Sequence, residues 1–429
     1  MPAWTERVRR QVLPNGLTLL VHRGPMPAVA VVAHLRAGFL DEPDGWTGLS
    51  HVLEHMIFKG SPRFGPGELA RAIKGAGGYV NAFTSYDATE YYAVLPPAGA
   101  EQAILALADA IRAPLLDADE LRRELGVIAE EARRKRDTPA AVAQETLHEA
   151  LYDVHRMRRW RIGQESAILA FTRDDVSAYH SSRYVPERAV VTVAGDVDPD
   201  ATLDLLARHW GDWTAGTADV PAGPEEPARH ALRVRTIRGD VQTAELRLGW
   251  RAVPPLHPDG VALELLAAAL GTGRGSRLSV ALRLAGLATG TGASFIAPAE
   301  LGLFAVGAAL AADRLDAALQ AIGREVLRVT RQPLPPGDLE RARTQLLAQL
   351  ARRYETAEGR ASALAAAEAL RDVALLAETE TRLQSLTAEQ VRDAAARYLD
   401  PATVSAAAFI PRNHQPDLSV DQLRSAFDA

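Results

Sequence analysis

The chain has 429 residues, of which 47% are hydrophobic and 24% are charged, and its formal net charge at pH 7 is −6. This length is sufficient for two or more domains with cores of their own, and the charge does not indicate nucleic acid or an anionic membrane as a partner. There is no cysteine, which excludes disulfides and thiolate ligands, so any metal must be held by histidine and carboxylate side chains.

Nothing in the sequence indicates a targeting or membrane-spanning segment. Residues 1–10 lack the apolar core of a secretory signal peptide. No run of about 18 uncharged apolar residues is present, so no helix is predicted to cross a bilayer. We therefore expect a cytoplasmic protein, with a processed precursor as the alternative.

The N-terminal segment is predicted to consist of strands. Apolar runs within residues 8–23 flank Asn15-Gly16, a dipeptide typical of the turn in a β-hairpin. Val29–Leu35 is rich in β-branched residues and is predicted to be another strand. Residues 38–47 contain glycine, proline and aspartate, and are predicted to form a loop.

Residues 48–60 contain His51, Glu54 and His55 in the order H-x-x-E-H. In a helix the two histidines lie about 40° apart on one face, so they could share one Zn²⁺ at roughly 2.0–2.1 Å. Glu54 lies about 60° to the other side of His51, close enough to reach a metal-bound water without being a ligand. This order mirrors H-E-x-x-H and suits the same hydrolytic chemistry. The alternative is two core histidines and a helix carboxylate that fall together by chance.

The next segment predicts a helix, two strands and a helix. Glu68–Lys74 is a short helix that ends at a glycine-rich turn. Tyr79–Leu95 is predicted to form two strands, and Ala100–Arg112 an amphipathic helix stopped by Pro114.

A long helix is predicted over Asp117–Arg136, with Asp117 as its N-cap and basic residues in its last turn. Glu124 and Glu131 lie seven residues apart and share one face of this helix, about 20° out of register, whereas Glu130 points roughly 100° away. Glu131 could complete a His₂Glu zinc site with an open position for water. The alternative for Glu131 is a solvated helix face.

The rest of the first half predicts further helices and one buried strand. The expected helices are 139–153, 172–184 and 200–210, and the strand is 188–196. His148 and His155 have no ligand spacing to another histidine, so we expect neither to bind metal.

A break in composition divides the chain into two domains. We predict an N-terminal catalytic domain over 1–215, a proline-rich linker over 216–231 and a C-terminal domain without zinc over 232–429. Leu263–Leu270 is an apolar helix at the place corresponding to His51–His55, but it has no histidine. The remaining predicted elements are strands at 232–238, 243–250, 293–295, 301–310 and 404–410, and helices at 314–329, 338–376 and 387–398.

This restart of the element order indicates an internal duplication of about 200 residues. Mixed strands and helices in each half predict an α+β fold. The glycine-rich segment Gly271–Ser276 lacks the ending of a Walker loop, which argues against a phosphate site.

Together these segments resemble the M16 peptidases, the inverted-zincin family, over nearly the whole chain. The segments that carry the resemblance are Asn15-Gly16-Leu17, residues 48–60, residues 77–92 with Asn81-Ala-x-Thr84, Glu124-x6-Glu131, Gly163-x-Glu165, residues 172–176, Tyr184-x-Pro186 and Val193-Ala-Gly-Asp196.

The resemblance implies a zinc metalloendopeptidase acting on short or unfolded peptides. By this resemblance His51, His55 and Glu131 bind one Zn²⁺ per chain, Glu54 is the general base, and Glu124 is a second carboxylate near the metal. It also implies two similar halves of the LuxS/MPP-like metallohydrolase type that close as a clamshell. A peptide substrate is expected to add as a strand near the residues Asn81, Ala82, Phe83 and Thr84.

The sequence departs from the family in the second half. There the family usually supplies an arginine and, seven residues later, a tyrosine; Arg283 matches, but no tyrosine occupies Thr289 or Gly290. The resemblance therefore implies a partner subunit, a homologous M16 chain in a heterodimer or a homodimer, and weak activity of the isolated chain. Three alternatives stay open: a peptidase that clears peptides generally, a maturation protease for one peptide, and a non-catalytic structural or binding subunit.

Overall fold

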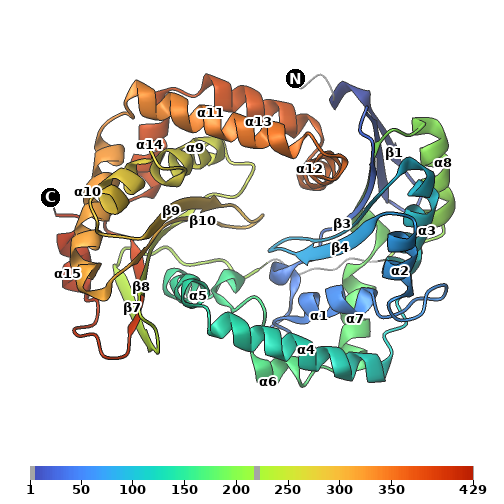
Figure 1. Cartoon of the computed structure of the whole chain (residues 1–429), viewed down its shortest axis with the longest axis horizontal. Coiled ribbons are helices and arrows are strands. Elements are labelled where there is room, and N and C mark those ends of the chain that lie inside the picture. The colour runs from blue at the N-terminus through green and yellow to red at the C-terminus, as the bar shows by residue number, and fades with distance from the viewer. Residues whose placement is uncertain (1–4, 217–222, 429) are drawn as a thin grey trace. The chain divides into compact units, whose positions relative to one another are not determined.

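The computed structural model describes residues 5–216 and 223–428 (Figure 1). Contacts divide the chain into two compact units, one made of residues 1–133, 160–222 and 350–380, the other of 134–159, 223–349 and 381–429. Each unit thus includes a segment from the other half of the chain. The division predicted from composition (1–215, 216–231, 232–429) stays a prediction about chain order, and residues 217–222 of its linker lie outside the described residues.

The first unit contains a six-stranded sheet in the order β1-β2-β6-β3-β5-β4. Its strands are β1 (Val8–Val12), β2 (Thr18–Arg23), β3 (Val29–Leu35), β4 (Tyr79–Thr84), β5 (Thr89–Leu95) and β6 (Ala189–Gly195). Strands β2 and β6 run parallel, and the other neighbours are antiparallel. The predicted strands of this half are confirmed, including the hairpin around Asn15-Gly16. Among the described strands, β4 pairs only with β5 and is therefore an edge.

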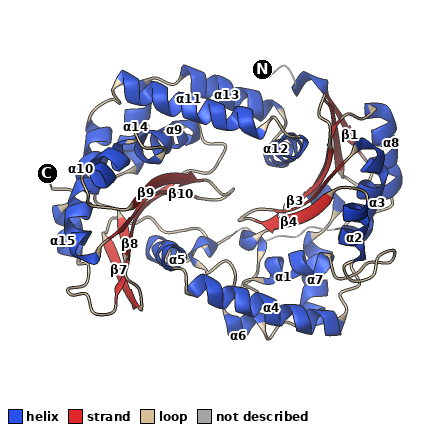
Figure 2. Ribbon diagram, in the orientation of Figure 1, coloured by secondary structure: helices blue, strands red, loops and turns tan. Residues whose placement is uncertain are grey.

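Helices cover one face of this sheet and enclose the main core of the first unit (Figure 2). The elements are α1 (Leu49–Ile57), α2 (Glu68–Gly75), α3 (Ala100–Arg112), α4 (Ala118–Arg136), α6 (Glu165–Ile168), α7 (Arg173–Arg183) and α8 (Pro199–Trp210). Every residue of β6 is buried, because its other face is covered as well.

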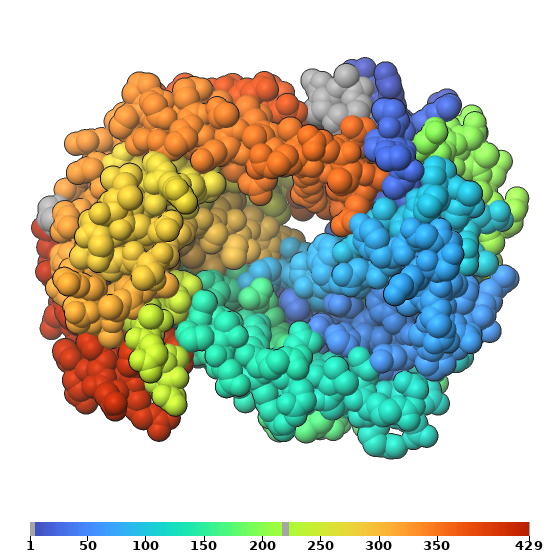
Figure 3. Space-filling view, viewed as in Figure 1, coloured from blue at the N-terminus to red at the C-terminus, as the bar shows by residue number. Residues whose placement is uncertain are grey.

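That other face is covered by α12 (Ala357–Leu370). Small and aliphatic residues of α12, among them Ala361 and Leu364, pack on Ala30, Val32 and Val190 of the sheet. In the space-filling view the orange atoms of this late segment lie next to the blue atoms of the N-terminal strands (Figure 3). The first unit is therefore completed by a helix from the C-terminal half.

The prediction of one helix over Asp338–Leu376 is wrong. The structure has α11 (Pro336–Arg353), α12, and then α13 (Ala374–Ser385). Thr356 caps α12 by accepting a 3.0 Å hydrogen bond from the amide of Gly359. A Cβ on Gly359 would lie 1.8 Å from the carbonyl oxygen of Arg353, so glycine allows the first turn of α12 to approach the end of α11 this closely.

The second unit repeats the topology of the first. Its sheet has the order β7-β11-β8-β10-β9, with β7 and β11 parallel, just as β2 and β6 are parallel in β2-β6-β3-β5-β4. The strands are β7 (Arg233–Gly239), β8 (Ala244–Ala252), β9 (Gly290–Ile296), β10 (Gly302–Leu310) and β11 (Ser405–Pro411). This repetition confirms an α+β fold of two similar halves.

Several helices of the second unit correspond in their order along the chain to helices of the first. The unit contains α5 (Pro139–Leu151), α9 (Gly260–Gly271), α10 (Leu315–Arg331), α14 (Ala388–Tyr398) and α15 (Val420–Ser425). Helix α5 packs so closely on β8 that a Cβ on Gly249 would lie 2.9 Å from side-chain carbons of Leu147 and Leu151. It thus covers one face of this sheet, as α12 covers one face of the other. Within the described residues, no helix is both long and apolar enough to cross a membrane.

The packing of α12 predicts a large stability effect at a position far from the N-terminal strands in sequence. Leu364 is fully buried, so Leu364→Ala should lower the free energy of unfolding by about 2–5 kcal/mol, because it leaves a cavity. Leu284→Ala, at a side chain that is 74% exposed, should change it by less than about 0.5 kcal/mol. Urea denaturation of both variants checks this. Equal, small effects would contradict the placement of α12 in the core.

Candidate metal centre

Helix α1 carries the H-x-x-E-H residues, and a buried carboxylate fixes its start. Glu42 is fully buried and accepts 2.9 Å hydrogen bonds from the amides of Gly48 and Ser50, together with one from the Ser50 hydroxyl. These bonds satisfy amides that a helix leaves open at its first turn, and the negative charge is favoured there by the helix dipole. Sequence analysis missed Glu42, although an acidic residue shortly before a helix is a recognisable signal.

Two glycines bring the start of α1 against the segment around residue 162. Gly48 has φ +99°, and a Cβ there would lie 2.7 Å from the carbonyl oxygen of Ile162. Gly163 has φ +86°, and a Cβ there would lie 2.6 Å from the carbonyl oxygen of Thr47. Both positions require glycine for conformation and for space, so the orientation of α1 is set by backbone contact.

The helix predicted over the H-x-x-E-H segment is confirmed, and it brings the three residues together. Its apolar face is buried, whereas His51, Glu54 and His55 are partly exposed. The Nε2 atoms of His51 and His55 lie 3.2 Å apart, and their rings are nearly perpendicular at 79°. One potential ligand atom from each of the three residues lies within 4.8 Å of the others, which makes this the one His/Asp/Glu group of metal-binding geometry in the described residues.

Glu131 reaches the same site from α4. Its Oε2 lies 4.0 Å from Nε2 of His51, and 42% of its side chain is exposed. Two ligands of a tetrahedral zinc ion at about 2.0–2.1 Å are about 3.3 Å apart. The imidazole pair has this spacing already, whereas Oε2 of Glu131 lies 4.0 Å from His51, and Glu131 is not in the group whose ligand atoms lie within 4.8 Å of one another. Two imidazole nitrogens and a carboxylate are a donor set typical of zinc, so the residues present fit the ion.

Glu124 lies behind the imidazole of His55. Its side chain is 9% exposed, Oε1 is 2.8 Å from Nδ1 of His55, and Oε2 pairs with Nζ of Lys59. Burial opposes the charge, but the hydrogen bonds from His55 and Lys59 outweigh it, so the pKa of Glu124 lies below its usual value. An ionised acceptor at Nδ1 favours the tautomer whose Nε2 offers a lone pair toward His51.

Glu54 occupies the other side of the helix face. Burial raises the pKa of Glu54 above its usual value; the hydrogen bond from the Thr84 hydroxyl and the nearby His55 oppose this, while the charge of Glu131 adds to it. A carboxylate with a raised pKa and a fixed orientation is suited to accept and return a proton.

Strand β4 brings the predicted substrate residues to this site. Thr84 at its end donates a hydrogen bond to Glu54, so one member of the Asn81–Thr84 set contacts the predicted base itself. Tyr79 and Phe83 are about half exposed, at 52% and 48%. Because the described strands leave one edge of β4 unpaired, its amides and carbonyls can accept another strand.

Arg283 belongs to the second unit, whereas His51 and His55 belong to the first. It is exposed on a π-helical turn, Ser279–Leu284, a conformation that is often found at functional sites. Arg277 anchors the preceding loop, with Nε 2.9 Å from Glu325 and Nη1 2.8 Å from Asp338. Thr289, next to Gly290 at the place where the resemblance leads one to expect a tyrosine, donates a 3.1 Å hydrogen bond to the backbone carbonyl of Ala309.

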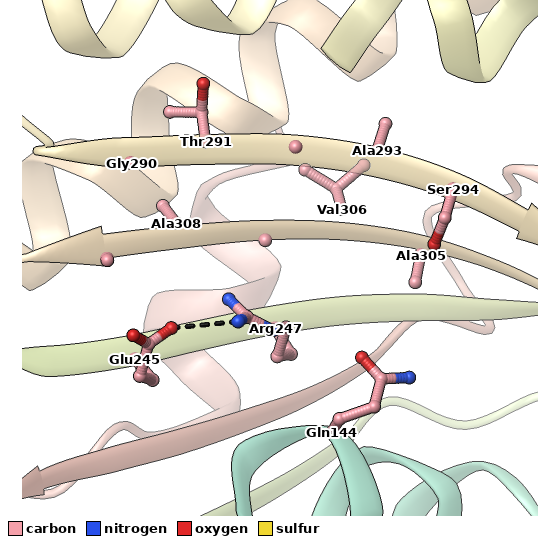
Figure 4. A pocket seen from close by; sticks show the side chains of 13 residues that line it. Gln144, Glu245, Arg247, Gly290, Thr291, Ala293, Ser294, Ala305, Val306 and Ala308 are labelled. Atoms are coloured by element: carbon pink, nitrogen blue, oxygen red, sulfur yellow. Dashed lines mark ion pairs between the residues drawn. The ribbon is translucent and has the colours of Figure 1, made fainter. Parts of the chain in front are cut away.

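A cavity of about 390 Å³ lies on the sheet of the second unit (Figure 4). Its floor consists of small residues of β9 and β10, and Arg247 pairs with Glu245 at 2.9 Å beside it. Gln144 of α5 forms another part of the lining. None of the predicted site residues lines this cavity, so it does not belong to the metal centre. His148 contacts Gln144, and His155 contacts Glu300. Neither histidine is in the group of described residues with metal-binding geometry.

Two family models match the sequence. The description of the first is "Insulinase (Peptidase family M16)", over residues 17–164, and that of the second is "Peptidase M16 inactive domain", over residues 170–346. The first match ends just before α6 and the second begins just after it, so the boundary lies within the first unit. H-x-x-E-H, Glu124 and Glu131 are all inside the first match.

Similar curated proteins include uncharacterized zinc proteases. ML0855 of Mycobacterium leprae is 31% identical, over 75% of this chain and 73% of its own. YmxG of Bacillus subtilis is 28% identical, over 83% and 86%. A probable mitochondrial-processing peptidase subunit beta of Arabidopsis thaliana is 28% identical, over 80% and 66%.

Solved structures share the fold. A protease from Helicobacter pylori gives a TM-score of 0.89 at 22% identity and covers 94% of this chain and 99% of its own. A putative M16-like peptidase from Alicyclobacillus acidocaldarius gives 0.82 at 22% identity, covering 94% and 98%.

The close approach at the start of α1 predicts that Gly48→Ala is strongly destabilising. The positive φ costs about 1–2 kcal/mol for a residue with a Cβ, and the contact with Ile162 adds to it. Gly75→Ala is the matched control, since a Cβ on Gly75 meets nothing within 4 Å and alanine favours a helix by about 0.5–1 kcal/mol. Chemical denaturation compares the two variants. If Gly48→Ala is as stable as Gly75→Ala, the backbone contact does not exist.

Proposed function

Because this chain belongs to peptidase family M16, we propose that it is a zinc-dependent endopeptidase that hydrolyses short or unfolded peptides. The observation that carries the proposal is the pair of Nε2 atoms of His51 and His55, 3.2 Å apart, with the carboxylate of Glu131 4.0 Å from one of them. His51, His55 and Glu131 are the proposed zinc ligands, one ion per chain.

The other site residues position the reacting groups. When bound, zinc lowers the pKa of a bound water toward about 7 and polarises a carbonyl. Glu54 accepts the proton of the attacking water and returns it to the leaving amine. Thr84, hydrogen-bonded to Glu54, keeps one oxygen of that carboxylate in place. Glu124 holds the ring of His55 through Nδ1.

The substrate is proposed to bind as an added strand along β4. Its main chain would pair with residues Asn81, Ala82, Phe83 and Thr84, which bring the peptide toward Glu54 at the Thr84 end. Main-chain pairing recognises any extended peptide, and folded proteins do not present such a segment. This supports short or unfolded peptides as the substrate class.

A homologous M16 subunit, as a different chain or a second copy of this one, is proposed as the partner. Arg283 is exposed, but Thr289 and Gly290 bring no phenol hydroxyl. A different chain that carries the tyrosine would supply this substrate contact, which a second copy of this chain could not. A non-catalytic structural or binding subunit is the second candidate, favoured by the match of residues 170–346 to an inactive domain. Retention of the ligand set and of Glu54 in the first half favours the enzyme.

The proposal predicts separate roles for two neighbouring glutamates of α4. Glu131→Gln should lose stoichiometric zinc, because it removes a ligand charge. Glu130→Gln should keep it, because Glu130 is exposed and pairs with Arg133. Zinc content after dialysis, measured by mass spectrometry, distinguishes the variants. If Glu131→Gln binds zinc as tightly as the wild-type chain, Glu131 is not a ligand.

The proposed base predicts a variant that binds metal but does not turn over. Glu54→Gln should retain zinc and lower the rate of hydrolysis of an unfolded peptide by at least about 10²-fold, since a positioned base contributes about 10²–10⁴-fold. Zinc content and peptide cleavage are measured on the same sample. Undiminished cleavage would exclude Glu54 as the base.

The partner proposal predicts low activity of the pure chain. Peptide cleavage should rise when a homologous M16 subunit with the tyrosine is added, and the two chains should co-elute on size exclusion. Full activity of the isolated monomer would exclude the partner and leave the zinc proposal intact.

A further inference from the structure

Lys59 lies two residues after the end of α1 at Ile57 and four residues after His55. Its ammonium group pairs with Oε2 of Glu124, while Oε1 of Glu124 is 2.8 Å from Nδ1 of His55. The Lys59 side chain is 29% exposed and that of Glu124 is 9% exposed. The two oxygens of the mostly buried Glu124 carboxylate are therefore held by His55 and Lys59, which lie four residues apart in the sequence.

We propose that Lys59 is a positioning residue of the metal centre, which acts through Glu124 by keeping it on the His55 ring and away from the metal. This inference rests on the proposed zinc site. It assigns a further residue to the metal centre. Lys59 is a cation that contacts neither metal nor substrate, but it fixes the position of the carboxylate of Glu124.

The need for such a residue follows from the geometry of α4. Glu124 and Glu131 lie on one face of this helix, and each has an oxygen close to one of the two histidines, 2.8 Å from His55 and 4.0 Å from His51. Both are carboxylates and could serve as the third ligand. What distinguishes them is their surroundings: the Glu131 side chain is 42% exposed, whereas Glu124 has a partner on each oxygen.

Without Lys59, one oxygen of Glu124 would be left mostly buried without its cation, which is unfavourable. The carboxylate could then rotate away from Nδ1 of His55. A histidine ligand depends on the acceptor at its other nitrogen for its tautomer and ring orientation, and loss of that acceptor weakens metal binding by about 10- to 100-fold.

Within the part of the chain that the structure describes, no other cation pairs with Glu124 in place of Lys59. The basic residues beside Glu124 on α4 pair with acidic residues of their own turn: Arg122 with Asp119 and Arg123 with Glu120. Among the described residues, the ion pairs of Glu124 are those with His55 and Lys59. Removal of this single ammonium group should therefore have an effect that its neighbours do not compensate.

The test measures zinc affinity of the full chain by competition with a chelator. Lys59→Met should weaken zinc binding by about 10-fold or more, and Lys59→Arg, which keeps the charge and a donor, should restore most of it. Lys74→Met is the matched control, since Lys74 is exposed on α2 and should leave the affinity unchanged. Thermal unfolding of the zinc-free variants verifies that each is folded.

A double-mutant cycle separates positioning from general electrostatics. If Lys59 acts through Glu124, then Lys59→Met should add little to the loss in zinc affinity already caused by Glu124→Gln. Additive losses, or a Lys59→Met variant that binds zinc like the wild-type chain, would overturn the inference and leave the zinc site standing. A wild-type chain that binds no zinc would overturn both.

Discussion

The Nε2 atoms of His51 and His55 face each other at 3.2 Å on α1. This spacing depends on surrounding residues that fix the direction of the helix and the orientation of the rings. The helix is short, and its direction cannot be set by its own hydrogen bonds. It is set by Glu42 at its first turn, by the backbone contact between Gly48 and the segment at Ile162, and by an apolar face sealed in the core. The ring of His55 is in turn held by Glu124. The orientation of the helix and of the His55 ring is thus fixed by groups outside the H-x-x-E-H residues themselves.

The two units share a topology but differ in what their equivalent helices carry. Helix α1 presents two histidines, whereas α9, in the corresponding place, is almost wholly apolar and has none. Each sheet is covered on its second face by a helix from elsewhere in the chain, α12 in the first unit and α5 in the second. Neither unit has a complete core without that helix, so the two halves depend on each other although only the first carries the H-x-x-E-H residues.

Much of the fold could be predicted because local signals were strong. Asn15-Gly16 between apolar runs predicted the β1–β2 hairpin, and the spacing of Glu124 and Glu131 placed both on one face of α4. The break between Arg353 and Ala357 could not be predicted, because the helical pattern around it is nearly continuous and the reason for the turn is the packing of α12 on strands more than 150 residues away.

The site was predicted only in part for the same reason. Residue spacing identified His51, Glu54 and His55 from one turn of helix. Glu42 precedes the helix and Lys59 lies within the motif of residues 48–60, but their roles follow from contacts that only the folded chain creates. Thr84 was predicted to meet the substrate, and this stays a prediction; the contact of its hydroxyl with Glu54 was not predicted. Such supporting residues are determined by tertiary structure and leave little trace in local sequence.

X-ray absorption at the zinc edge of the zinc-loaded chain tests the central claim most directly. The account predicts a first shell of nitrogen and oxygen at about 2.0–2.1 Å, with the outer-shell scattering of two imidazoles that disappears for one ring when His51 or His55 is replaced. A zinc shell without imidazole scattering, or one unaffected by either replacement, would contradict the account.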